Sequence, residues 1–120
     1  MADTETTPEL APTRAAELIR DGAKLIDVRQ EEEHEAAHIE GDELVPFDQL
    51  KHRAASFDQS RPLVLYCRSG DRSGAAVQAL RASGYDAYSI DGGLLAWTEQ
   101  GLPVEPADGV VREPSGLPPD

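Results

Sequence analysis

Short apolar runs alternate with amphipathic stretches along most of this chain of 120 residues. Apolar runs rich in leucine, β-branched and aromatic side chains predict strands at 24–28, 44–45, 62–66 and 85–90, and Glu9-Leu10 adds a short edge strand. Helical patterning lies between them, at 12–20, 31–37, 47–57, 74–82 and 94–100. Strands that alternate with short helices indicate an α/β fold, an open, mostly parallel five-stranded sheet with helices on both faces.

The pattern also delimits the domain. We expect residues 9–104 to form one folded unit, preceded by a disordered N-terminal segment, residues 1–8. Residues 103–120 hold five of the nine prolines and little apolar patterning. We therefore interpret residues 105–120 as a flexible tail rich in proline and glycine. Within the domain, the helix at 47–57 is expected to turn Phe47, Leu50 and Ala54 inward.

The composition and charge of the chain limit the classes of partner that we expect. The formal net charge is −12, which argues against nucleic acid and anionic membranes as partners. The first residues do not resemble a signal peptide and no apolar run approaches membrane-spanning length, so a cytoplasmic location is expected. Residues 27–48 carry nine carboxylates against one base, Arg29. Such a run usually forms a solvated face, and a docking surface for a basic partner is the alternative.

The candidate chemistry lies at the only cysteine, Cys67. It directly follows the strand predicted at 62–66 and precedes the helix predicted at 74–82. Backbone N–H groups and the positive end of a helix attract anions at such a junction, and two arginines nearby favour the thiolate. We predict Cys67 as the nucleophile. The candidate substrate-binding residues are Arg68, Ser69, Gly70, Asp71, Arg72 and Ser73.

A second pair of polar residues is expected at the same edge of the sheet. Asp27 and Arg29 follow the strand at 24–28, and the carboxyl ends of parallel strands are where ligands bind in such folds. We assign both residues a supporting role, as a wall of the active site held by an ion pair or by loop N–H groups.

Five segments together carry a family resemblance. They are residues 25–29, 35–41, 64–73, 91–97 and 101–104. In order and spacing they resemble the single-domain rhodaneses, which are thiosulfate sulfurtransferases, over roughly residues 9–104. The sequence departs from the family pattern at three turn positions, His34, Ala37 and Glu40, and places an acid, Asp71, inside the anion-binding loop.

The resemblance implies a double displacement with no cofactor and no metal. Cys67 would take the outer sulfur of thiosulfate or a similar small donor as a persulfide. It would then pass that sulfur to cyanide, or to a thiol or dithiol that can belong to a protein. Gly70 would permit a turn with positive φ, and Ser73 would also cap the following helix.

The same residues also suggest three other functions. Phosphatases with a cysteine nucleophile have arginine six positions after it, whereas Arg72 follows Cys67 by five, so phosphoryl transfer is disfavoured. His34-Glu35-Ala36-Ala37-His38 matches the HExxH zinc motif, which needs an apolar, buried helix and a third ligand downstream. We interpret the match as coincidence, because the segment is the most acidic of the chain and Gly41 follows it within three residues. A rhodanese-like persulfide carrier or regulatory module with little turnover remains the alternative, and Asp71 favours it.

Overall fold

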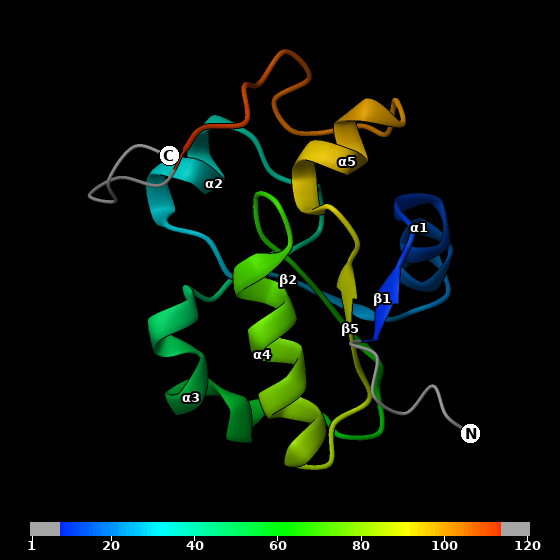
Figure 1. The fold of residues 1–120 in the computed structure, drawn as a ribbon, viewed down its shortest axis with the longest axis vertical. Coiled ribbons are helices and arrows are strands. Elements are labelled where there is room, and N and C mark those ends of the chain that lie inside the picture. The colour runs from blue at the N-terminus through cyan, green and yellow to red at the C-terminus, as the bar shows by residue number, and fades with distance from the viewer. Residues whose placement is uncertain (1–7, 114–120) are drawn as a thin grey trace.

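The computed structural model describes residues 8–113 and contains one five-stranded sheet in the order β1-β5-β4-β2-β3 (Figure 1). Every pair of neighbouring strands in it is parallel. The strands are β1 (Glu9–Leu10), β2 (Lys24–Asp27), β3 (Glu43–Leu44), β4 (Leu63–Tyr66) and β5 (Ala87–Ile90). The prediction of a mostly parallel α/β sheet is therefore confirmed.

Helices cover both faces of the sheet, as predicted (Figure 1). One face packs on α3 (Leu50–Arg53) and α4 (Asp71–Ala82), and the other on α1 (Pro12–Arg20) and α5 (Gly93–Glu99). A further short helix, α2 (Glu31–Ala36), follows β2.

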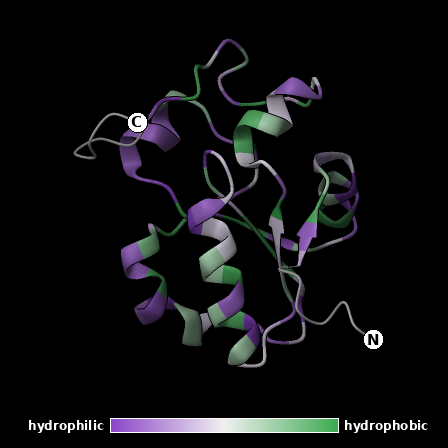
Figure 2. Ribbon diagram, viewed as in Figure 1, coloured by the Kyte–Doolittle hydropathy of each residue, from purple (hydrophilic) through white to green (hydrophobic). Residues whose placement is uncertain are grey.

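Strand β4 joins the two halves of the core because its side chains alternate. Leu63 and Leu65 belong to the cluster under α4, whereas Val64 and Tyr66 belong to the cluster under α5, and all four are fully buried. Figure 2 shows hydrophobic and hydrophilic positions alternating along α4 and α5, whereas α2 is mostly hydrophilic. Burial on both sides explains why this strand appears in the sequence as an uninterrupted apolar run.

The helix predicted at 47–57 is wrong in two respects. The segment is broken into a 3₁₀ turn (Phe47–Gln49), the single turn of α3 and a second 3₁₀ turn (Ala54–Ser56). Leu50 is buried and Ala54 partly so, but Phe47 is 44% exposed. Because Val45 already fills the core beside β2, the chain leaves the interior at Pro46 and carries Phe47 outward.

The residues after 104 differ from the expected tail as far as the structure describes them. Glu105 and His38 exchange two backbone hydrogen bonds, of 2.9 and 2.7 Å. Val111 packs against the core cluster under α5. Glu105 and Val111 therefore contact the domain although most residues between them are exposed. Residues 114–120 and most of the predicted N-terminal segment, residues 1–7, lie outside the described range. In residues 8–113, no helix is long and apolar enough to cross a membrane.

Candidate active site

Cys67 lies immediately after β4, and its side chain is buried. Two backbone amides point at its sulfur: Gly70 N–H at 3.1 Å and Ser73 N–H at 3.4 Å. The turn that allows this has Gly70 at φ 107°, a conformation that favours glycine. Amides aimed at one atom stabilise negative charge there, so the loop can hold a thiolate, or an anion attached to it.

The helix after the loop begins earlier than the sequence predicts. α4 starts at Asp71 with Gly70 as its N-cap, rather than at Gly74. Ser73 is therefore inside the first turn and does not cap the helix, which corrects that prediction. Its hydroxyl instead lies 3.5 Å from the Cys67 sulfur and 2.7 Å from the hydroxyl of Ser89 on β5. Both serines are fully buried, so Ser73 contributes a hydroxyl as well as an amide to the thiol.

The carbonyl side of the loop is held by the start of α5. Leu94 N–H donates to the carbonyl of Cys67 at 2.8 Å, and Leu95 N–H donates to that of Arg68 at 3.1 Å. Because the carbonyls of Cys67 and Arg68 are bonded to α5, the amides of the loop can point toward the sulfur. Gly93 makes this approach possible: it has φ +63°, and a Cβ there would lie 2.5 Å from both loop carbonyls.

Arg72 is engaged by a residue that the sequence analysis placed in a solvated face. Both of its terminal nitrogens donate to the carboxylate of Glu33, at 2.9 and 3.0 Å, and the Glu33 side chain is fully buried. Glu33 also accepts a hydrogen bond from the backbone of Gln30 in a capping box. The spacing Gln30-x-x-Glu33 before a helix is the sequence signal that could have identified this inward acid.

The other loop residues have different environments. The Nε of Arg68 is buried and has no hydrogen-bond partner among residues 8–113, so an anion bound beside it after a small shift of the side chain would give it an acceptor. Ser69 and Asp71 are exposed. Within residues 8–113, Asp71 forms no ion pair, and Arg72 pairs with Glu33 instead of with it.

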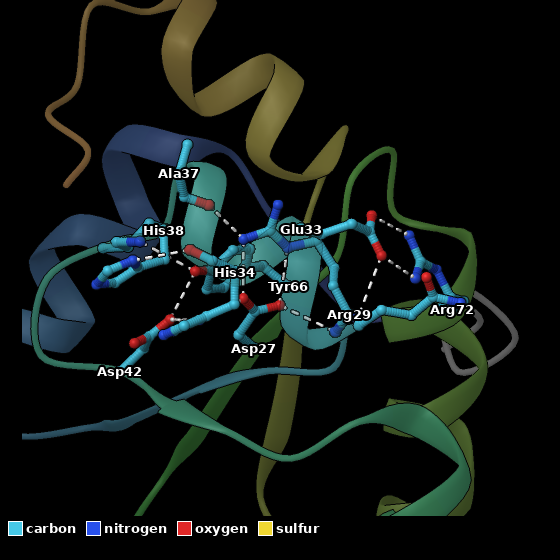
Figure 3. Close-up of polar contacts among 11 residues, drawn as sticks. Asp27, Arg29, Glu33, His34, Ala37, His38, Asp42, Tyr66 and Arg72 are labelled. Atoms are coloured by element: carbon cyan, nitrogen blue, oxygen red, sulfur yellow. Dashed lines mark hydrogen bonds and ion pairs between the residues drawn. The ribbon is translucent and has the colours of Figure 1, made fainter. Parts of the chain in front are cut away.

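Asp27 and Arg29 form a fully buried ion pair (Figure 3). Two guanidinium nitrogens of Arg29 reach both carboxylate oxygens of Asp27, at 2.9 and 2.8 Å, and one also donates to the carbonyl of Ala37 at 2.6 Å. Burial raises the pKa of Asp27, but hydrogen bonds from His34 and Arg29 outweigh it and lower the pKa below its ordinary value. The two supporting residues thus hold each other and tie β2 to the end of α2.

Taken together, the site is a buried thiol approached by two backbone amides and one hydroxyl, at the carboxyl edge of a parallel sheet. Such a site can stabilise a negatively charged sulfur without a metal or a cofactor. The fold and site define a class of α/β domains that hold one buried cysteine between a central strand and the start of a helix.

Comparison with known proteins identifies the family within that class. The Rhodanese-like domain family model matches residues 11–100, and the chain belongs to this family. It is 31% identical over 105 residues to thiosulfate sulfurtransferase GlpE of Pseudomonas aeruginosa, covering 87% of this chain and 92% of that protein. A rhodanese-related protein of Thermoplasma volcanium has a similar structure, with a TM-score of 0.76 and 26% identity, over 81% of this chain and 96% of that one.

Other relatives are longer than this chain. YqhL of Bacillus subtilis, an uncharacterized protein, is 42% identical over 76 residues, which cover 62% of this chain and 60% of that protein. The probable adenylyltransferase/sulfurtransferase MoeZ of Mycobacterium tuberculosis is 35% identical over 78% of this chain but only 25% of its own length. The chain spans about half to three-fifths of the length of three of its curated relatives. Relatives named as sulfurtransferases support a transferase domain.

Proposed function

We propose that this domain is a sulfurtransferase that carries sulfane sulfur on Cys67, taking it from thiosulfate or a similar small donor. One observation carries the proposal: the amides of Gly70 and Ser73 converge on the Cys67 sulfur, at 3.1 and 3.4 Å. A persulfide extends the thiol by one sulfur and keeps a negative charge at neutral pH, so amides gathered at this loop suit both states of the cysteine.

The reaction is a double displacement. The Cys67 thiolate attacks the outer sulfur of thiosulfate, a new S–S bond forms, and the old S–S bond breaks with its electron pair leaving on sulfite. Cyanide or a thiolate then attacks the outer sulfur of the persulfide. That step forms thiocyanate or a new persulfide and returns the electron pair to Cys67.

The two arginines of the loop, Arg68 and Arg72, make different contacts, which suggests different roles. Arg72 is held by Glu33 through two hydrogen bonds, so it anchors the loop and contributes its charge from a fixed position. Arg68 has a buried Nε without a partner. We therefore assign the sulfonate group of the donor to Arg68, because its binding would give that N–H an acceptor.

The short loop also supports sulfur over phosphorus as the transferred atom. The chain passes from Cys67 to the first residue of α4, Asp71, through three residues. Phosphoryl transfer needs amides around three oxygens and an arginine free to bind them. Here the arginine at the end of the loop is already paired with Glu33.

Mass spectrometry combined with kinetics tests the proposal. Incubation with thiosulfate should add one sulfur atom to the wild-type protein and none to Cys67→Ser, and cyanide should then remove it with formation of thiocyanate. An adduct that forms but turns over negligibly with cyanide would favour the persulfide carrier. If no sulfane donor produces an adduct on Cys67, the sulfurtransferase proposal is wrong.

A further inference from the structure

A second cluster of reactive side chains lies on the far side of the Asp27–Arg29 pair. Figure 3 shows Asp27 between Arg29 and His34, with His38 and Asp42 beyond His34. One donor atom from each of His34, His38 and Asp42 lies within 4.8 Å of the other two. None of these three residues has a part in the sulfur chemistry above.

The local backbone fixes all three residues of the cluster. His34 is in the last turn of α2, and His38 follows it by four residues, so the two rings stack with centroids 4.0 Å apart and planes 17° apart. The backbone of His38 is held by two hydrogen bonds to Glu105. Asp42 returns to the cluster after a turn at Gly41, which has φ 91°. Short-range structure therefore holds the three residues close together, and a turn of the imidazole rings would direct their nitrogens at one ion.

The hydrogen bonds of the two imidazoles define which ring nitrogens are available. His38 Nδ1 lies 3.0 Å from the carbonyl of His34, and His34 Nδ1 lies 2.9 Å from a carboxylate oxygen of Asp27. A carbonyl and an ionised carboxylate only accept, so both Nδ1 atoms carry the proton. In the neutral rings each Nε2 then keeps its electron pair. Histidines that bind metals almost always donate their other N–H to a carboxylate or a carbonyl in this way.

The charges around the cluster favour a cation. The side chains of Asp27 and Asp42 are 0% and 3% exposed, and among residues 8–113 the only arginine or lysine paired with either is Arg29, through Asp27. Asp42 accepts a hydrogen bond from the Tyr66 hydroxyl at 2.6 Å, and that hydroxyl accepts one from the amide of Ile39. Asp42 is thus oriented by Tyr66 but not neutralised, and the half-buried histidines leave a path from solvent.

We propose that His34, His38 and Asp42 bind one divalent transition-metal ion of the Zn²⁺ type. Two imidazoles and a carboxylate are a donor set that Zn²⁺ accepts, with a water molecule completing four ligands. The HExxH pattern was interpreted as coincidence because its surroundings are acidic and Gly41 follows it closely. Asp42, directly after that glycine, adds a third donor beside the two histidines. The site is not that of a zinc protease, because α2 ends at Ala36 and Glu35 is exposed.

Zinc alone, added to the full chain, tests this proposal. Competition with a chromophoric chelator should give one equivalent of Zn²⁺ per wild-type chain. His34→Gln and Asp42→Asn should each weaken binding by about tenfold or more. His52→Gln is the matched control, since it removes the one remaining histidine, exposed on α3. Cys67→Ser should also keep full affinity, because the thiol is not a ligand.

Two further measurements keep the outcome clear. Circular dichroism in the presence of a chelator identifies any variant that fails to fold, and the visible spectrum of Co²⁺ bound to the wild-type protein should show tetrahedral nitrogen and oxygen ligation without a thiolate band. Any of three results would overturn the proposal. They are the absence of stoichiometric zinc binding, a thiolate–cobalt band that is lost in Cys67→Ser, and an unchanged zinc affinity in folded Asp42→Asn. These results are independent of sulfur transfer.

Discussion

Arg72 and Glu33, 39 positions apart, form a bidentate ion pair that joins the start of α4 to the start of α2. Glu33 is fully buried and Arg72 is 24% exposed at its side chain. The loop that holds Cys67 is therefore anchored from the side by an acid that contacts neither the thiol nor the solvent. Removing the arginine would leave a buried carboxylate without its counter-ion.

Arg72→Ala should lower the free energy of unfolding by about 2–4 kcal/mol, because it leaves the carboxylate of Glu33 buried without a counter-ion. Arg72→Lys should lose less stability than Arg72→Ala, because lysine keeps the positive charge but cannot form the two parallel hydrogen bonds. Urea denaturation measures both. Arg14→Ala is the control: its pair with Glu17 is exposed on α1, and its loss should change stability by about 0.5 kcal/mol or less. Equal losses in both variants would contradict the anchoring role.

Gly93 and Gly74 should respond to alanine in opposite directions. A Cβ on Gly93 would lie 2.5 Å from the carbonyls of Cys67 and Arg68, and φ is +63°. Gly93→Ala should therefore destabilise the fold by about 2 kcal/mol or more and slow sulfur loading of Cys67. Gly74 lies inside α4 with no atom within 4 Å of a Cβ. Gly74→Ala should raise stability by about 0.5–1 kcal/mol. Thermal unfolding of the pair checks this, and a neutral Gly93→Ala would be inconsistent with the close contact.

Much of this architecture is predictable from local patterns because the core strands are short, buried and apolar. All five strands, and helices α1, α2 and α5, are found within two residues or so of their expected bounds. The start of α4 was not predictable in this way. Serine favours the N-cap and glycine disfavours a helix interior, yet Ser73 and Gly74 are both helical because the Cys67 sulfur and Ser89 take up the amide and hydroxyl of Ser73.

The candidate site shows a similar limit. Cys67 and the role of Gly70 follow from the order strand, loop, helix. Glu33 was missed because a run of acidic residues looks uniformly solvated, whereas only one face of α2 meets the domain. Phe47 was misplaced because its spacing with Leu50 and Ala54 fits a continuous helix, which the departure of the chain at Pro46 prevents. In each case contacts between distant parts of the chain determine whether the side chain is buried, and the spacing of residues along the sequence does not reveal those contacts.

Arg68→Ala should raise the KM for thiosulfate about tenfold with a smaller effect on kcat. A hydrogen bond to a charged group contributes about 1.5–3 kcal/mol, and the Nε of Arg68 is a buried side-chain N–H with no acceptor among residues 8–113. Steady-state kinetics with cyanide as acceptor measures the change. Arg61→Ala, whose guanidinium bonds the carbonyl of Gly22, is the matched loss of an arginine and should keep the wild-type KM. If the KM for thiosulfate is unchanged in Arg68→Ala, a residue other than Arg68 binds the donor's anionic group.

His34 should titrate above its ordinary pKa in metal-free protein. Its hydrogen bond to Asp27 raises the pKa most, and the charge of Asp42 raises it further, against burial and Arg29. Because the folded pKa is the higher one, the stabilising contribution is fully present below about pH 6.5 and is lost as pH rises through the folded value. NMR titration in a chelator measures this directly. The stability difference between wild type and His34→Gln should shrink from pH 6 toward alkaline pH, and a His34 pKa below 6.5 would refute it.

Asp71 should weaken the donor's binding through its charge alone. It is exposed at the first position of α4 and has no cationic partner within residues 8–113, so its carboxylate repels an approaching dianion. Asp71→Asn should lower the KM for thiosulfate about two- to fivefold, the size expected for one charge several ångströms away in a largely aqueous setting. The gain should fade as salt is added, since exposed charges are screened. Glu99→Gln, which removes one charge at the far end of α5, should leave KM unchanged. If Asp71→Asn also has no effect at low salt, the carboxylate faces away from the path of the donor.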